Sequence, residues 1–204
     1  MENTIIILTS DHGEALGEKG ERHHGFFAYN NTLRVPLVLY IPGASPGVVE
    51  TNACHLDLFP TVCDILGLPL PEHLQGESLL PLLEGKERRK KLIYFESMAP
   101  HFSLAAAPLT GFIEDTLKFI DPPLKEVYDL KASPIEEVNV SSTSDLTNLM
   151  KKLESLKKSL KAPDIRPNPR SDKEAIRPLL ESLAYVTSQP PENKTWGLKT
   201  TPRL

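Results

Sequence analysis

Cysteine is scarce in this chain of 204 residues, and an excess of positive charge and long hydrophobic runs are absent from its sequence. Its two cysteines, Cys54 and Cys63, are too few for a disulfide framework, and neither has the neighbours of a nucleophile or a zinc site. No apolar run approaches the roughly 18–20 residues that a membrane-spanning helix needs. The net charge is −4, so we expect neither nucleic acid nor an anionic membrane as a partner.

The N-terminal residues also lack a charged leader followed by an apolar stretch and a small-residue cleavage site, so we expect no signal peptide within this chain. The composition is that of a globular protein, with 40% hydrophobic and 25% charged residues. The length is sufficient for one domain with a core of its own.

Two apolar runs predict buried strands in the first quarter of the chain. Ile5–Leu8 is a continuous apolar run that ends in Thr-Ser-Asp, and Val35–Gly43 repeats the pattern before a turn. Such runs suit strands that are covered on both faces, as in a parallel sheet. The polar, glycine-rich segment between them cannot supply a complete covering layer. We therefore expect other parts of the sheet to be missing from this chain, whose first residue would then fall within a domain.

The rest of the chain alternates helical and strand-like patterns. A helix is expected between Asp57, a good N-cap, and Gly67, a good terminator. Its inward face should consist of Leu58, Val62, Ile65 and Leu66. Short strand-like segments from residue 92 onward predict a small antiparallel sheet. Leucines at 3-4-3-4 spacing over 146–160 predict an amphipathic helix with its N-cap at Ser144 or Asp145, and 171–186 predicts a second short helix.

An acidic residue and a histidine, Asp11 and His12, follow the first apolar run directly. In open α/β sheets, ligands bind at the carboxyl edge of the strands, which is where this pair should lie. A carboxylate beside an imidazole can bind a divalent cation, and Gly13 allows the chain to turn sharply after the pair. The alternative is that Asp11 caps a following helix while His12 lies on the surface.

Two further histidines, His23 and His24, stand in the segment that leads to the second apolar run. A single histidine is usually structural or solvated. Two histidines in a loop that must return across the same sheet edge are expected to face the same cleft as Asp11 and His12.

Four motifs, in order and with sensible gaps, resemble those of the sulfatase family within the alkaline phosphatase superfamily. The likeness covers about residues 2–140, and the Asp-His-Gly-Glu form is typical of bacterial members. The motifs are the strand and metal-ligand loop in "NTIIILTSDHGEALGEKGE", the aromatic-x5-R-V-P strand in "FFAYNNTLRVPLVLYIPG", the D-x-x-P-T helix and following turn in "LDLFPTVCDILGLPLPEHLQGESLLPLL", and the Y-D-L element in "EVYDLKASPIEEVNV", with Ser133 where aspartate is common.

The resemblance implies an α/β fold. Residues 1–91 would be the C-terminal portion of an alkaline-phosphatase-like sheet domain, 92–140 a small antiparallel β subdomain, and 141–204 a helical, proline-rich tail. It also implies hydrolysis of a sulfate ester by a formylglycine nucleophile with a divalent cation, calcium in most members. By position, Asp11 and His12 match metal ligands of the family. Because calcium prefers oxygen ligands, His12 keeps manganese or zinc open.

His24 lies near the place where many family members have a lysine that contacts the sulfate, although it stands one residue further from the aromatic Tyr29. The resemblance therefore implies a catalytic and substrate-binding role for His24. A protonated imidazole could hold a sulfate oxygen or protonate the leaving group. His23 is a second substrate-binding candidate, and the substrate would be a sulfated small molecule or glycan.

Two family motifs do not occur in this chain: the C/S-x-P-x-R motif of the nucleophile and the early Asp-Asp pair of metal ligands. Both belong to the family's N-terminal half, which would be the missing partner. We therefore expect the chain alone to be inactive and to bind metal weakly. Family members are often exported, which would place the enzyme in the periplasm or outside the cell. Two alternatives stay open: a phosphodiester or phosphonate hydrolase or phosphoryl transferase of the same superfamily, and a non-catalytic remnant or a module that completes another chain.

Overall fold

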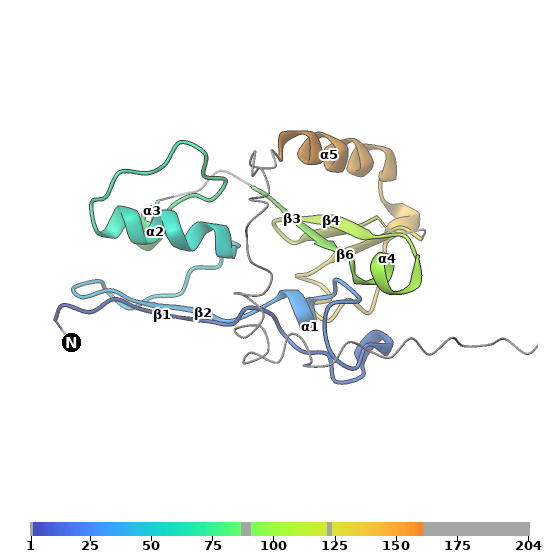
Figure 1. Ribbon diagram of the computed structural model, residues 1–204, viewed down its shortest axis with the longest axis horizontal. Coiled ribbons are helices and arrows are strands. Elements are labelled where there is room, and N and C mark those ends of the chain that lie inside the picture. Colours follow the sequence, from blue (N-terminus) through green and yellow to red (C-terminus); the bar gives the residue numbers. More distant parts are fainter. Residues whose placement is uncertain (1, 87–90, 122–123, 161–204) are drawn as a thin grey trace, which may run out of the picture. The chain divides into compact units, whose positions relative to one another are not determined.

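Two antiparallel sheets, one of two strands and one of four, occur in the computed structural model, which describes residues 2–86, 91–121 and 124–160 (Figure 1). These residues belong to one unit, Met1–Leu160. Within the described ranges, no helix is both long enough and apolar enough to cross a membrane. The helix expected at 171–186 lies outside the described residues, and the three-part division of the chain stays a prediction.

The first sheet pairs β1 (Ile6–Thr9) with β2 (Leu37–Tyr40). The strands run antiparallel, so the expectation of a parallel sheet is wrong for these two strands. The expectation that these strands are buried on both faces is also wrong, because neither strand has a buried residue. An apolar run reports neither the direction of a strand nor which elements cover it. The cross-strand pairs Ile6–Tyr40 and Leu8–Val38 share one face of this ladder, and their side chains are 39–58% exposed.

The helix expected after Asp57 is α2 (Leu58–Ile65), and Gly67, with a left-handed φ of 63°, follows two residues after its end. Its expected inward face is only partly correct, because Leu66 lies beyond the last helical residue and is 56% exposed. The buried residues are instead Pro60, Thr61 and Cys63. The buried hydroxyl of Thr61 is satisfied, because it accepts a hydrogen bond from the backbone N–H of Leu79, just before α3 (Leu80–Leu83).

The small antiparallel sheet is confirmed, with the strand order β3-β4-β5-β6. Its strands are β3 (Leu92–Ser97), β4 (Leu109–Glu114), β5 (Leu117–Ile120) and β6 (Glu126–Asp129). One face packs against α5 (Leu146–Ser159), through a buried cluster of Phe112, Phe119, Val127, Leu149 and Leu153. The helix begins as expected, because the Asp145 carboxylate accepts a hydrogen bond from the backbone N–H of Asn148 at 3.0 Å.

The opposite face of the small sheet contacts the segment that contains the histidines. A second buried cluster joins Phe95, Ile120 and Tyr128 of the sheet to Ala28, with Tyr29 and Leu33 packed against it. Two short helices lie close to this contact in the sequence, α1 (Asn30–Leu33) and α4 (Ala99–Leu104). The described 3₁₀ turns are Glu18–Gly20, His55–Asp57 and Ser141–Thr143.

Candidate active site

The turn after β1 rests on the backbone of α1. The N–H of Gly13 donates a hydrogen bond to the carbonyl of Thr32 at 2.8 Å. A Cβ atom on Gly13 would lie 2.1 Å from the backbone oxygen of Asn31, which is closer than any real contact. Glycine is therefore required here because two backbones approach closely. This contact fixes the position of His12, the residue before it.

Asp11 and His12 present their donor atoms on adjacent residues of this turn. The Asp11 carboxylate accepts a hydrogen bond from the backbone N–H of His12 at 3.0 Å, and this bond is the main reason why the pKa of Asp11 lies below its ordinary value. The Nδ1 atom of His12 lies 2.7 Å from the carbonyl of Gly13. Since a carbonyl only accepts, Nδ1 is the protonated nitrogen and Nε2 has a free lone pair.

The Nε2 atom of His12 lies 3.6 Å from a carboxylate oxygen of Asp11, too far for a hydrogen bond. Ligands at about 2.0–2.6 Å from one ion stand about 3–4 Å from each other, so the spacing fits a shared divalent cation. The capping alternative for Asp11 is not observed, because the next helical element described after it is the 3₁₀ turn Glu18–Gly20. The two residues thus form a donor pair at the end of β1.

The structure brings His24 next to His12, as the sequence predicted. The two imidazole rings stack with their centroids 3.7 Å apart and their planes at 27°. Glu14, which the sequence analysis did not single out, accepts a hydrogen bond from Nδ1 of His24 at 2.9 Å. His23 lies 3.5 Å from the other carboxylate oxygen of Glu14, and its side chain is 86% exposed. Glu14 therefore orients His24, and its place two residues after His12 was the signal that could have identified it.

Among the described residues, one group of three could hold a metal, with ligand atoms within 4.8 Å of one another: His12, Glu14 and His24. Asp11 does not belong to that group. The nearly parallel rings argue against one ion bound by both histidines in this arrangement, because their in-plane lone pairs do not converge. The geometry is better suited to a cation at Asp11 and His12, with His24 beside it and oriented by Glu14.

The loop with His24 is fixed at both of its sides. Buried Glu21 accepts hydrogen bonds from the backbone N–H groups of Phe26 and Phe27, which closes the loop on itself. Ser97, at the end of β3, donates a hydrogen bond to the carbonyl of Gly25 and lies 3.1 Å from that of Phe26. The small sheet therefore determines where His24 stands.

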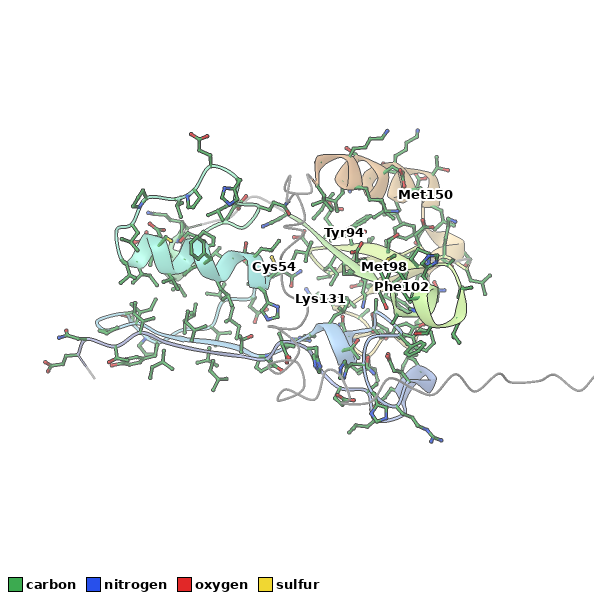
Figure 2. All side chains as sticks on the ribbon, in the orientation of Figure 1. Cys54, Tyr94, Met98, Phe102, Lys131 and Met150 are labelled. Carbon is green, nitrogen blue, oxygen red and sulfur yellow. The ribbon has the colours of Figure 1, made fainter. Side chains whose placement is uncertain are left out.

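An open pocket of about 260 Å³ lies between the histidine loop and the end of β3. Its walls combine imidazole, apolar and acidic side chains, among them His12, His24, Phe27, Leu33, Glu96 and Met98. Met98 directly precedes α4, and Figure 2 labels it together with Phe102 of that helix. Two imidazoles on one wall of a pocket could bind an anion of sulfate size or transfer a proton to a leaving group.

Solved structures of similar shape give the class of this fold. The structure of BT4656 in complex with its substrate D-glucosamine-2-N,6-O-disulfate matches 77% of this chain and 34% of that one, with 30% identity and a TM-score of 0.62. The phosphonate monoester hydrolase of Agrobacterium radiobacter matches 77% of this chain and 35% of that one, with 29% identity and a TM-score of 0.55. The fold is therefore the α/β fold of alkaline-phosphatase-like hydrolases.

Residues 17–162 match the family model of N-sulphoglucosamine sulphohydrolase, C-terminal. The choline-sulfatase of Rhizobium meliloti (strain 1021) is 33% identical over 148 residues, which are 69% of this chain and 28% of that protein. The chain belongs to the sulfatase family, as the resemblance of its motifs predicted. It spans between about a quarter and about a third of the length of these relatives.

Proposed function

We propose that this chain supplies one side of the active site of a sulfatase that hydrolyses sulfate esters with a divalent cation. One observation carries the proposal: His12, which forms the donor pair with Asp11, stacks its ring on that of His24, and both histidines line one pocket. Membership of the sulfatase family supports the reaction class. The chain would contribute cation ligands and a substrate-binding imidazole.

Asp11 and His12 would hold the cation, with calcium as the proposed metal and manganese or zinc as alternatives. When bound, the cation would withdraw charge from the sulfate oxygens. The hydrogen bond from His12 Nδ1 to Gly13 keeps Nε2 directed as a ligand, the arrangement usual for metal-binding histidines. Two ligands are fewer than the four or more that such ions take, so the chain alone would bind the metal weakly.

His24 would hold a sulfate oxygen or donate a proton to the leaving oxygen. Its Nδ1 atom is hydrogen-bonded to Glu14, which leaves Nε2 as the nitrogen that meets the substrate. His23 would act at the edge of the site, because it is exposed and is not among the pocket-lining residues.

The proposed substrate is a sulfated small molecule or glycan. Both kinds are represented among the relatives, by the choline-sulfatase and by BT4656 with its disulfated glucosamine. We also propose that this chain is inactive alone and is completed by an N-terminal part of the enzyme that carries the nucleophile. The small share of each relative that the chain covers is consistent with this proposal.

Cleavage of a phosphonate or phosphate ester is the second candidate. The phosphonate monoester hydrolase of Agrobacterium radiobacter favours it, since its structure matches at 29% identity. The histidine in the cation pair also suits metals other than calcium. The sulfate reaction remains our proposal because the family model is that of a sulfohydrolase.

The test is a chimera in which residues 2–160 replace the matching C-terminal segment of the choline-sulfatase. We expect hydrolysis of an aryl sulfate in preference to a phosphonate monoester, and loss of that activity in the Asp11→Asn and His12→Ala variants. Glu137→Gln and His73→Ala, which change exposed residues, serve as matched controls. Activity that survives both site variants would refute the proposed site, and turnover by the 204-residue chain alone would refute its dependence on a partner.

Cation binding is measured separately on the chain itself, by Mn²⁺ titration with NMR detection. Paramagnetic broadening should begin at Asp11 and His12 and should weaken in Asp11→Asn but not in Glu137→Gln. Broadening that begins elsewhere would place the cation at another site. This readout does not depend on whether the chimera is active.

A further inference from the structure

A buried ion pair lies on the face of the small sheet that meets the histidine segment. The Nζ atom of Lys118 stands 2.5 Å from a carboxylate oxygen of Glu136, and the two side chains are 0% and 1% exposed. Lys118 belongs to β5, next to Phe119, whose ring points to the opposite face and to α5. A well-packed apolar pair could stabilise the fold as well as a buried ion pair of this kind. Stability alone therefore does not explain the pair.

The second carboxylate oxygen of Glu136 accepts a hydrogen bond from the backbone N–H of Asn30 at 2.6 Å. The side chain of Asn30 is bound as well: its amide nitrogen donates to the carbonyl of Pro134, and its oxygen lies 3.3 Å from Nζ of Lys118. Asn30 is the first residue of α1. The start of this helix is thus attached to the 134–136 segment and to β5 by three hydrogen bonds.

The same short helix supports the cation pair. The carbonyl of Thr32 in α1 accepts the hydrogen bond of Gly13, and Gly13 follows His12 directly. A continuous path of hydrogen bonds and the three helical residues 30–32 therefore connects the buried pair with the turn that presents Asp11 and His12. Glu136 itself has a φ of 58°, a left-handed conformation that is strained for a residue other than glycine. Its side chain is held by Lys118 and Asn30, and its backbone by hydrogen bonds to Ser133 and Lys19.

We propose that Lys118 and Glu136 are positioning residues, which fix α1 and through it the relative placement of His12 and His24. The inference rests on the proposed function for the meaning of that placement. An apolar pair could fill the same volume, but it would leave the N–H of Asn30 without its acceptor. The acceptor on Glu136, rather than the charge of the pair, is the feature that sets the geometry of the site.

Two double variants of the full chain separate acceptor from charge: K118M/E136Q and K118M/E136L. Both remove the two charges, and only the glutamine offers an oxygen to the N–H of Asn30. We expect K118M/E136Q to retain the NOE between the rings of His12 and His24 and the slow amide exchange of Gly13. In K118M/E136L the NOE should vanish and the Gly13 amide should exchange at least about tenfold faster, while the amides of Phe112 and Phe119 stay protected.

Equal ring NOEs and equal Gly13 exchange in the two double variants would overturn the proposal and leave the pair a purely structural role. If K118M/E136L also loses amide protection in β4 and β5, the small sheet itself has been disturbed, and the test is then made by amide exchange in the unmodified chain. There, the amides of Asn30 and Gly13 should open together, with the same protection and the same dependence on urea. Separate openings would overturn the proposal. None of these measurements requires turnover. The positioning role can therefore be refuted while the proposed function stands, and the proposed function can be refuted while the positioning role stands.

Discussion

Gly13 connects the cation pair to α1, and its lack of a side chain is the reason that it can. Gly13→Ala would place a methyl group 2.1 Å from the backbone oxygen of Asn31, where neither backbone can move independently. We expect a loss of about 1–3 kcal/mol in the free energy of unfolding and a weaker NOE between His12 and His24. Urea denaturation and NMR measure the two effects.

Gly47→Ala is the matched control, because Gly47 has nothing within 4 Å of its Cβ position and has no positive φ. It should change the free energy of unfolding by less than about 0.5 kcal/mol. The NOE between His12 and His24 should equal that of the unmodified chain within experimental error. A Gly13→Ala variant that behaves like this control would show that the turn can move away from α1. The position of His12 would then have to be explained by other contacts.

Tyr29 gives the chain a dependence on alkaline pH. Its hydroxyl donates to the carboxylate of Glu126 at 3.0 Å, and burial together with that carboxylate raises the pKa of Tyr29 from 10.0 to about 12. Because the folded pKa lies above the unfolded one, the contribution to stability is complete below pH 10 and is lost as the pH rises toward 12. We expect Tyr29→Phe to reduce the fall in the free energy of unfolding across this range.

Tyr128 shares the same carboxylate, and its pKa is raised for the same two reasons, so some alkaline loss should remain in Tyr29→Phe. Lys19 lies over both rings, with its Nζ atom 5.3 Å from the centroid of Tyr29 and 5.6 Å from that of Tyr128. Denaturation in urea between pH 9 and pH 12, with tyrosinate absorbance as a second signal, measures the difference. Parallel curves for the two proteins would contradict the assignment to Tyr29.

At the level of elements, α5 stabilises the small sheet by covering one of its faces. Leu153 is 1% exposed in the cluster with Phe112 and Phe119. Leu153→Ala should cost about 2–5 kcal/mol in the free energy of unfolding, because a buried side chain is replaced by a cavity. Met150→Ala, in the same helix at 40% exposure and labelled in Figure 2, should cost less than about 1 kcal/mol. Equal losses would show that α5 does not pack as described.

Elements with a regular local pattern could be predicted from the sequence. The leucine spacing in α5 and the short strands of the small sheet report only on neighbours along the chain, and both predictions are confirmed. The inward face of α2 was partly wrong because it includes Thr61, whose buried hydroxyl is satisfied by a hydrogen bond from Leu79, which apolar spacing does not contain. The antiparallel pairing of β1 and β2 was also missed, because it depends on backbone hydrogen bonds between distant segments, which an apolar pattern does not contain.

The part of the candidate site that follows from the course of the chain could be predicted from the sequence. His24 must return toward His12, because its loop connects two strands that pair with each other, and the ring contact agrees with this. Glu14 could have been suspected from its place two residues after His12, but its hydrogen bond with His24 and the pair Lys118–Glu136 could not be predicted. They depend on contacts between residues that are 10 and 18 positions apart and on burial that arises only on folding. The cation ligands Asp11 and His12 stay a prediction.

On the scale of the whole molecule, the histidine segment and the small sheet act as one structural group. Ser97 binds the histidine loop, Glu136 binds α1, and the cluster around Phe95 and Ala28 fills the space between them. The candidate site therefore depends on residues more than 70 and 100 positions away in the sequence. Variants in the small sheet should affect the histidines even where they are far from the pocket.

The exposed face of the β1–β2 ladder has a consequence for the behaviour of the chain in concentrated solution. Ile6, Leu8, Val38 and Tyr40 form an apolar ribbon on a ladder that has two strands within the described part of the chain. Such ribbons template the addition of further strands, so the purified chain should self-associate at lower concentrations than its charge suggests. Val38→Lys should raise that concentration in light scattering, whereas Val48→Lys, at an exposed site outside the ladder, should not. Solubility would then be governed by one ribbon rather than by the surface as a whole.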